Sequence, residues 1–314
     1  MAVVILGDTD FKEHELVAQA VEDRGEEAYL VDVRRWPGDD PAEFSIASGE
    51  CIFGEPIPFE DVTGVFSMLQ SVFPTFLPEY DWFDEKPERV AYKQLVEWQR
   101  LFYSMLAAFE AHGARAAVSP TDAYWNFHRP WMLELYHEND VPVPETTFTN
   151  DPDRVVEFVE KHSKAIVQGV NGGWTPELIH PSDLDPERLE KLAAAPIKLQ
   201  EYAPGTDTRA FVVDGTFAGM VQYEYDPEAI SFKSAEVKYS ELDSTPIDPD
   251  AELREAVVRA GELSPSAYAT VDVRLTEDGE FTILESNTPG RFAAHDLAGW
   301  TDVSGRLAEF LLES

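Results

Sequence analysis

Two polar side chains end an apolar run in the segment FTILESN, residues 281–287. Residues two apart in a β-strand point to the same face, so we expect Glu285 and Asn287 to lie side by side. The turn-forming pair Asp278-Gly279 precedes this run and favours a hairpin with a two-residue loop. Counting back from that loop places Asp272 directly opposite Glu285, with their Cβ atoms about 5 Å apart.

The opposed carboxylates of Asp272 and Glu285 are expected to repel each other by about 3 kcal/mol at an effective dielectric constant of about 20. A bound cation would remove this repulsion, and carboxylate and amide oxygens suit Mg²⁺ or Mn²⁺ better than zinc. We therefore predict a metal site formed by Asp272, Glu285 and Asn287. The apolar side chains of the hairpin, Leu284 included, are expected on the opposite, core-facing side. The alternative interpretation is that these acids are solvated side chains of an acidic protein.

The charge of the chain is strongly one-sided. Its 60 Asp and Glu residues against 24 Lys and Arg give a formal net charge of -36, spread along the whole sequence. Such a surface repels nucleic acids and anionic membranes, so we expect neither as a partner. Molar salt, with a Debye length of about 3 Å, would screen the self-repulsion. We interpret the acidity as adaptation to a halophilic habitat.

The single cysteine, Cys51, excludes an internal disulfide and agrees with a reducing compartment. We expect it to be a small apolar residue near a strand. No stretch approaches 18 apolar residues, and the N-terminus lacks the basic start and long apolar core of a signal peptide. These features predict a cytoplasmic location.

The elements that must position the polar set follow from the hydrophobic pattern. Strands and helices alternate over residues 1–118, which predicts a parallel α/β layer. Its strands are expected at 2–7, 27–33, 64–69 and 114–120, and its helices at 14–25 and 88–113. Further along, helices and strands lead to two Asp-Gly hairpins, over residues 208–225 and 268–287, which predict an antiparallel α+β region.

Four features occur in one order: a Pro-containing extended segment, a glycine loop NGGW after a strand, the segment LQEYAPGTDTRAFVVDG, and the predicted metal set. This order resembles the ATP-grasp superfamily from about residue 120 onward, and within it the glutathione-synthetase-like and ribosomal-protein glutamate ligases. The first third also resembles the leading domain of ligases that cyclise microviridin-type peptides. The resemblance implies a pre-ATP-grasp domain at 1–118 and two ATP-grasp subdomains at 119–198 and 199–314.

The resemblance also implies ATP and Mg²⁺ (or Mn²⁺) as cofactors and assigns residues to them. The family's metal ligands correspond to the same three residues found by pairing. The strand whose main chain meets the adenine corresponds to QEYA, which implies nucleotide contacts at Gln200, Glu201 and Ala203. The phosphate or acyl-phosphate arginine corresponds to Arg209, and a basic position after the first hairpin corresponds to Lys233.

The sequence departs from the family pattern at two basic positions. The family usually has two lysines that contact ATP phosphates, where this chain has Arg129 and Gln168. Arginine keeps the charge and can bind phosphate through its fork, whereas glutamine is neutral. Losing a charged hydrogen bond could cost about 1.5 to 3 kcal/mol. The glycine loop is also short, with only Gly172 and Gly173.

Two residues after the hairpin fall where family members begin to line the acceptor site. Arg291 could hold a substrate carboxylate. His295 could contribute to the same site, and a structural or surface role is the alternative for it.

The sequence therefore predicts an ATP- and Mg²⁺-dependent ligase that joins a carboxylate to an amine through an acyl-phosphate. A small metabolite, an amino acid and a peptide all remain open as the carboxylate substrate. The alternatives are a nucleotide-binding protein without ligase activity, for which Gln168 is the motivating residue, and a small-molecule kinase. The oligomeric state, a homo-oligomer included, is left open.

Overall fold

A computed structural model describes residues 1–313 apart from 8–10, 37, 39, 47, 69–87, 120–121, 172–174, 227–228 and 232–241. The chain forms two compact units. The first unit comprises Met1–Tyr124, Pro265–Ala269 and Thr288–Ser314, and the second comprises Trp125–Ser264 and Thr270–Asn287. The C-terminal segment thus belongs to the first unit, whereas the sequence analysis placed it with the preceding subdomain. The finer division at residues 118 and 198 stays a prediction.

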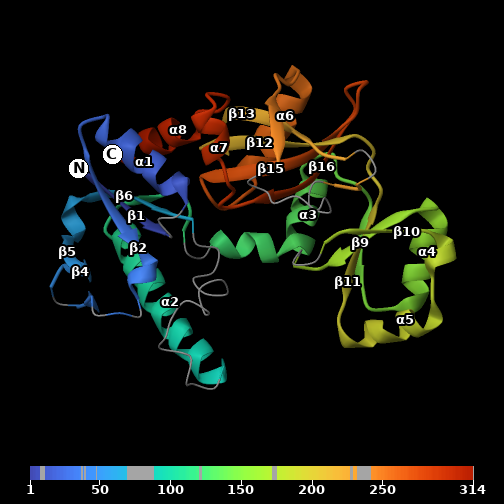
Figure 1. Cartoon of the computed structure of the whole chain (residues 1–314), viewed down its shortest axis with the longest axis horizontal. Helices are drawn as coiled ribbons and strands as arrows, with labels where there is room; N and C mark the ends of the chain where they lie inside the picture. The colour runs from blue at the N-terminus through green and yellow to red at the C-terminus, as the bar shows by residue number, and fades with distance from the viewer. Residues whose placement is uncertain are drawn as a thin grey trace. The chain divides into compact units, whose positions relative to one another are not determined.

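The first unit is built on a four-stranded parallel sheet in the order β2-β1-β6-β7 (Figure 1). These strands are β1 (Ala2–Gly7), β2 (Glu27–Asp32), β6 (Val62–Ser67) and β7 (Arg115–Ala116). All residues of β1 are buried, as expected for an inner strand of a parallel sheet. The helices of this unit are α1 (Lys12–Glu22), α2 (Glu88–Ala111), α7 (Ala293–Leu297) and α8 (Val303–Leu312). The predicted parallel α/β layer is confirmed.

A small antiparallel sheet beside this layer was not predicted. It contains β3 (Ala42–Phe44), β4 (Glu50–Phe53) and β5 (Glu55–Pro58). Its buried side chains join an aromatic core with Trp36, Phe59 and Phe102. Cys51 is fully buried on β4, in agreement with the apolar role expected for it. Strands this short carry too few residues for their alternation to stand out in the sequence.

Two antiparallel sheets form the second unit. One has the order β10-β9-β11-β8, with β8 (Thr146–Thr149), β9 (Ala165–Gly169), β10 (Glu177–Ile179) and β11 (Ile197–Glu201). Helix α4 (Pro152–His162) packs on this sheet, and α5 (Pro186–Glu190) follows β10. Asp151 caps α4, because its side chain accepts a hydrogen bond from the backbone N–H of Asp153.

The second sheet of this unit has the order β14-β13-β12-β15-β16. Its strands are β12 (Thr206–Val213), β13 (Thr216–Glu224), β14 (Asp243–Pro246), β15 (Tyr268–Leu275) and β16 (Phe281–Asn287). Helices α3 (Arg129–Glu138) and α6 (Ala251–Glu262) share its apolar core. Short 3-10 turns complete the chain at Val33–Arg35, Phe59–Asp61, Asp122–Phe127, Pro181–Asp183 and Lys191–Ala194.

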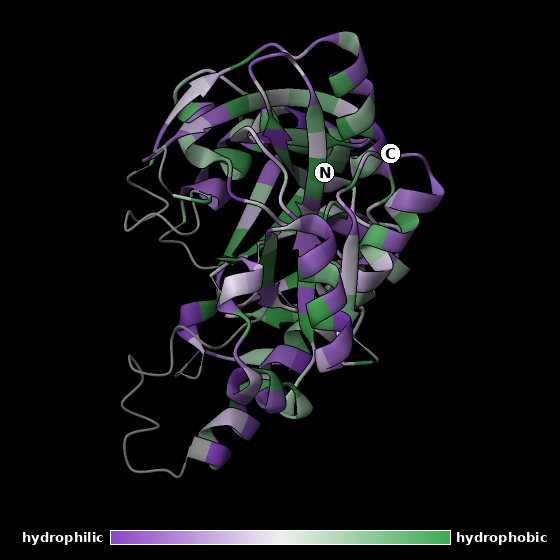
Figure 2. Cartoon of the chain, turned by 90° about the vertical axis from the view of Figure 1, so that its right-hand side faces the viewer, coloured by the Kyte–Doolittle hydropathy of each residue, from purple (hydrophilic) through white to green (hydrophobic). Residues whose placement is uncertain are grey.

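Apolar residues gather along the strands, and the helices carry both hydrophilic and hydrophobic residues (Figure 2). Within the described part of the chain, no helix has the length and apolar character needed to cross a membrane.

The first Asp-Gly hairpin has the predicted two-residue loop. Val213 pairs with Thr216, and the loop residues Asp214 and Gly215 have φ angles of 46° and 66°. Positive φ at both central positions is the signature of a type I′ turn.

The second Asp-Gly hairpin differs from the prediction in its loop. Leu275 pairs with Phe281, and the backbone N–H of Gly279 donates to the carbonyl of Thr276. The turn therefore lies one residue earlier than expected, with Gly279 in the left-handed region at φ 89°. A bulge in the pairing between Asp272 and Val273 compensates for the shift. The predicted pairing of Asp272 with Glu285 is thus confirmed, although the assumed loop was wrong.

The bulge also corrects the predicted facing of Leu284. Ile283, not Leu284, lies in the apolar core with Val271 and Val273. Leu284 is half-buried and lines a cavity together with Glu285. An extra residue in one strand rotates the alternation by one position, which a count from the loop does not reveal.

Candidate active site

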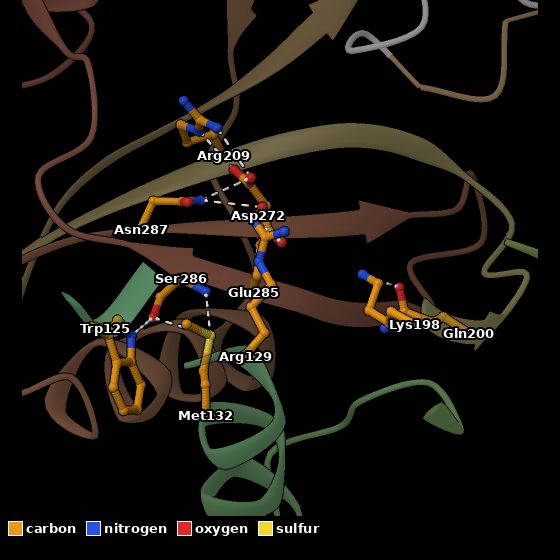
Figure 3. Close-up of polar contacts among 10 residues, drawn as sticks. All are labelled: Trp125, Arg129, Met132, Lys198, Gln200, Arg209, Asp272, Glu285, Ser286 and Asn287. Atoms are coloured by element: carbon orange, nitrogen blue, oxygen red, sulfur yellow. Dashed lines mark hydrogen bonds and ion pairs between the residues drawn. The ribbon is translucent and has the colours of Figure 1, made fainter. Parts of the chain in front are cut away.

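Three polar side chains of the second hairpin meet on one face of the sheet (Figure 3). Asp272 and Glu285 are directly opposed and only 3% and 4% exposed. The Asn287 Nδ2 lies 3.3 Å from Asp272 Oδ2 and 3.5 Å from Glu285 Oε1. The alternative interpretation, a solvated acidic face, is wrong for Asp272 and Glu285, because both carboxylates are buried.

Two buried arginines neutralise these carboxylates. Arg209 on β12 binds Asp272 in a bidentate pair, with Nε 2.7 Å from Oδ1 and Nη2 3.1 Å from Oδ2. Arg129, the first residue of α3, places Nη2 2.9 Å from Glu285 Oε2 (Figure 3). The repulsion that motivated a cation is therefore already offset by the protein's own charges. Repulsion between the two carboxylates is therefore no reason to expect a metal, and only the oxygen ligands that they offer still favour one.

The donor set fits Mg²⁺ in its chemistry. The carboxamide lies within hydrogen-bonding reach of both carboxylates, and all three groups can present oxygen. The amide of Asn287 must turn over to direct Oδ1, in place of Nδ2, toward a cation. Among the described residues, no group of three or more His, Cys, Asp and Glu side chains is arranged so that it could hold a metal ion. This set of two acids and one amide stays the predicted metal site.

An anion also fits at this face. Arg129 is 6% exposed, and its Nε and Nη1 have no hydrogen-bond partner within the described residues. A buried guanidinium with two unused donors is costly unless a ligand satisfies them. A phosphate oxygen is the kind of acceptor that matches such a fork.

The reverse face of β16 fixes the strand that carries the ligands. The Ser286 Oγ accepts hydrogen bonds from Trp125 Nε1 at 2.8 Å and from Tyr136 Oη at 2.6 Å. Ser286 is fully buried, and its backbone N–H lies 3.4 Å from Met132 Sδ. Burial raises the pKa of Tyr136 far above its ordinary value, so its hydroxyl stays a donor. Residues on either side of Ser286 are thus held in place by packed α3 and the preceding turn.

A cavity within the second unit brings most of the predicted site residues together. Its walls come from β9, the end of β11 with the following linker, β12, β15 and β16; the predicted residues among them are Gln168, Gln200, Glu201, Ala203, Asp272 and Glu285. Arg129, Arg209 and Asn287 are not among the lining residues. The cavity holds about 70 Å³, whereas small-molecule sites typically hold about 300 Å³ or more. A nucleotide would therefore need the walls to move apart.

A second cavity, of about 350 Å³, lies beside α4 and α5. Its lining is largely aliphatic and contains none of the predicted metal ligands. It shares only Gln168 with the first cavity.

The structure adds two basic residues that the sequence analysis missed. Arg274 lies on the cavity wall with Nη1 2.8 Å from Asp207 Oδ1 and 3.0 Å from Tyr225 Oη. Its Nε donates to the carbonyl of Ala203 at 3.2 Å, so it braces the linker. Burial, with the nearby charge of Asp207, raises the pKa of Tyr225 to about 12. The signal was available, because Arg274 follows Asp272 by two residues in the same strand.

The second missed residue is Lys198, which is 3% exposed on the cavity wall. It precedes Gln200 by two residues on β11, so the same-face rule of strands could have identified it.

The remaining predicted residues are not brought to this cavity. Lys233, Gly172 and Gly173 lie outside the described residues. Arg291 and His295 belong to the first unit, where Arg291 stacks on Phe11 at 3.6 Å and His295 stacks on Trp300. Their predicted contacts with an acceptor substrate stay predictions.

Comparisons with known proteins agree with this geometry. The fold matches PsnB, an ATP-grasp ligase solved with a minimal precursor, Mg and ADP, with a TM-score of 0.77 and 24% identity over 99% of this chain and 97% of that one. It also matches the macrocyclase MdnC from Microcystis aeruginosa MRC, solved with the precursor peptide MdnA (TM-score 0.80, 18% identity, 100% of both chains). The chain has the ATP-grasp fold.

A third structure extends the match to another branch. A RimK domain ATP-grasp protein from Sphaerobacter thermophilus DSM 20745 aligns over 100% of both chains with a TM-score of 0.62 and 18% identity. No family model matches the sequence, and no curated protein matches it either. At these identities the likeness establishes the fold, and the expected ATP-grasp resemblance is confirmed at that level.

Proposed function

We propose that this protein is an ATP- and Mg²⁺-dependent ligase that joins a carboxylate to an amine through an acyl-phosphate. The observation that carries the proposal is the buried set Asp272, Glu285 and Asn287 beside a cavity whose wall includes the linker Glu201–Ala203. Nucleotide and metal ligands would meet at this place. PsnB with Mg and ADP has the same fold, which supports the assignment.

We assign the carboxylate substrate to a peptide. Both PsnB and MdnC were solved with precursor peptides, and each aligns with this chain over nearly its whole length. The sequence alone left metabolites, amino acids and peptides open, and these structural neighbours favour the peptide.

The cofactors would be held by residues on the cavity wall and next to it. Asp272, Glu285 and Asn287 would bind Mg²⁺ or Mn²⁺, which when bound offsets negative charge that develops on phosphate oxygens. The main chain of the linker near Gln200 and Ala203 would meet the adenine, as the family resemblance implies. The Arg274 bond to the carbonyl of Ala203 holds this linker in place.

The two arginines would act on the anionic groups. Arg129 offers its unused Nε and Nη1 to a phosphate, while its Nη2 stays paired with Glu285. Arg209 is fixed by Asp272, so its charge is held in position before any substrate arrives. Pre-positioned charge of this kind lowers a barrier because no reorganisation is needed during the reaction. Lys233 is the remaining basic residue proposed for this step.

A second candidate is a nucleotide-binding protein with this fold that lacks ligase activity. Two observations favour it: the neutral Gln168 lines the cavity, and both carboxylates of the predicted metal site are already paired with arginines. A cation would have to share these carboxylates with the arginines.

Product analysis separates the candidates. The protein is incubated with Mg-ATP, a panel of synthetic peptides containing Asp or Glu, and hydroxylamine as the amine. A ligase releases ADP only when protein and an accepted peptide are both present, and it yields a peptide hydroxamate. Nucleotide binding without any hydroxamate or peptide-dependent ADP release favours the second candidate. A phosphorylated alcohol would indicate a kinase instead.

A further inference from the structure

One buried side chain, that of Arg274 on β15, connects two walls of the first cavity. Its Nε donates to the carbonyl of Ala203 in the linker at 3.2 Å, and its Nη1 donates to the carbonyl of Ile230 at 3.3 Å. Ala203 and Ile230 both line the cavity, and Arg274 is 6% exposed. The distance between the linker and Ile230 is therefore set by a guanidinium that both of them contact.

The guanidinium is itself fixed on its other side. Its Nη1 lies 2.8 Å from Asp207 Oδ1 and 3.0 Å from Tyr225 Oη. Asp207 is 4% exposed, so this ion pair is screened little by salt. Because the donors of an arginine form a rigid planar fork, these contacts also fix the direction in which Nε points. The carbonyl of Ala203 is thus held by a donor that cannot turn away without breaking the pair with Asp207.

The linker Glu201–Ala203 is also held at its other end and in the middle. The backbone N–H of Glu201 donates to the carbonyl of Glu145 at 2.8 Å. The Nζ of Lys164 lies 3.8 Å from the centre of the Tyr202 ring, which is a cation–π contact. The main chain of the linker therefore has one preferred arrangement before any ligand arrives.

We infer that Arg274 is a positioning residue that makes the cavity select adenine over guanine, because it holds the linker in this arrangement. Adenine presents an amino donor at the position where guanine presents a carbonyl acceptor. A main chain held in place to pair with one of these bases leaves buried groups unpaired with the other, and unpaired groups cost affinity. A linker that moves freely would adapt to both bases. This inference rests on the proposed function, because it takes the linker to meet the base.

A fixed linker is compatible with the entry of a nucleotide into a cavity of about 70 Å³. The segment that contains the linker leads from β11 to β12 and so connects the two sheets of the second unit. The walls that these two sheets carry can move apart while Arg274 keeps the linker in place.

Calorimetry with three ligands tests the inference. Mg-ADP, Mg-GDP and Mg-tripolyphosphate, which has no base, are titrated into wild type, Arg274→Lys and Tyr225→Phe. Lysine keeps a positive charge beside Asp207 but lacks the fork that reaches Ala203 at the same time. Arg274→Lys is therefore expected to weaken Mg-ADP binding by about tenfold to a hundredfold. Its affinities for Mg-GDP and Mg-tripolyphosphate should change by less than about twofold, so the preference for ADP over GDP falls.

Tyr225→Phe is the matched control, because it removes one hydrogen bond of the same guanidinium and leaves the bond to Ala203. It should keep the preference for ADP over GDP within about twofold of wild type. Thermal melts of each variant verify the fold. Should Arg274→Lys not fold, the double variant Arg274→Met/Asp207→Asn is compared in its place, because it leaves no uncompensated buried charge.

An unchanged preference in the Arg274 variant, an equal loss for all three ligands, or an equal loss in Tyr225→Phe would each overturn the inference. A wild type that binds Mg-ADP and Mg-GDP equally would also overturn it, while leaving the proposed function in place. If wild type binds no Mg-ADP, the proposed function and this inference both fail.

Discussion

At the scale of single residues, the site is a row of four buried charges in which two adjacent acids, Glu285 and Asp272, lie between two arginines, Arg129 and Arg209. The two acids would destabilise the hairpin if they were unpaired, and each arginine would be an uncompensated buried charge without its acid. Each ion pair therefore offsets the cost of burying its acid and its arginine. A cation that enters this set competes with the arginines, which predicts that removing an arginine strengthens the cation site.

The variant Arg129→Met tests this competition. It should lower the free energy of unfolding by about 3 to 5 kcal/mol, because Glu285 loses its buried partner. Added Mg²⁺ should then raise its melting temperature more than that of wild type, because the freed carboxylate binds the ion. Arg274→Met is the matched control, since it breaks a similar buried pair with Asp207. Equal Mg²⁺ effects on both variants would argue against a cation site at Glu285.

The buried thiol gives a second test at this scale. Burial raises the pKa of Cys51 to about 12, while an unfolded cysteine has its ordinary value of about 8.5. Only the thiolate reacts readily, so the native protein should be inert to a thiol reagent at pH 8. The same protein unfolded in denaturant should react fully. Rapid modification of the native chain would show that the first unit opens often at β4.

At the scale of elements, two glycines with positive φ lie at the site, one in the turn of the second hairpin and one in the linker before β12. Gly279 has φ 89° and open space around the position of a Cβ. Gly205 has φ 108°, and a Cβ there would lie 2.5 Å from the carbonyl oxygen of Leu275. The two positions share a backbone requirement but differ in packing.

We expect Gly279→Ala to cost about 1 to 2 kcal/mol of stability, the price of a left-handed residue with a Cβ. Gly205→Ala should cost about 3 kcal/mol or more, because the steric clash with backbone is added. Chemical denaturation of the two variants measures the difference. Similar costs would mean that the linker before β12 relaxes easily.

The elements also show how far the sequence could predict this site. The opposed pair Asp272 and Glu285 followed from a count of alternating residues, and the count succeeded because a turn shift and a bulge cancel. Neither the turn shift nor the bulge can be recognised in the local residue pattern, so the predicted orientation of Leu284 was wrong. The pairing of Arg129 with Glu285 could not be predicted, because it joins the end of a helix to a strand that is distant in the sequence. Lys198 needed only the strand rule, applied to one more strand.

At the scale of the whole molecule, the net charge of -36 acts on both units at once. Repulsion among surface carboxylates destabilises a compact state, and salt screens it. The buried ion pairs of the site are screened much less than exposed charges. The salt response of stability should therefore come from the surface and leave the site's arrangement unchanged.

The melting temperature is accordingly expected to rise by about 10 °C or more between 0.1 and 2 M KCl, with screening as the physical cause. Differential scanning calorimetry over a KCl series measures it. A matched series in sucrose, which carries no charge, should give a smaller rise. A flat response to KCl would contradict the interpretation of the acidity as a halophilic adaptation.

The central claim, that the second hairpin forms a metal-dependent nucleotide site, is tested most directly by calorimetric titration of ATP in molar KCl. Wild type, Glu285→Gln and Glu280→Gln are compared with and without Mg²⁺. Glu280 is a suitable control because it is an exposed glutamate in the loop of the same hairpin and does not line the cavity. The account predicts Mg²⁺-dependent binding by wild type and Glu280→Gln that is lost in Glu285→Gln. Binding that persists unchanged in a folded Glu285→Gln variant, or no binding by wild type, would contradict it.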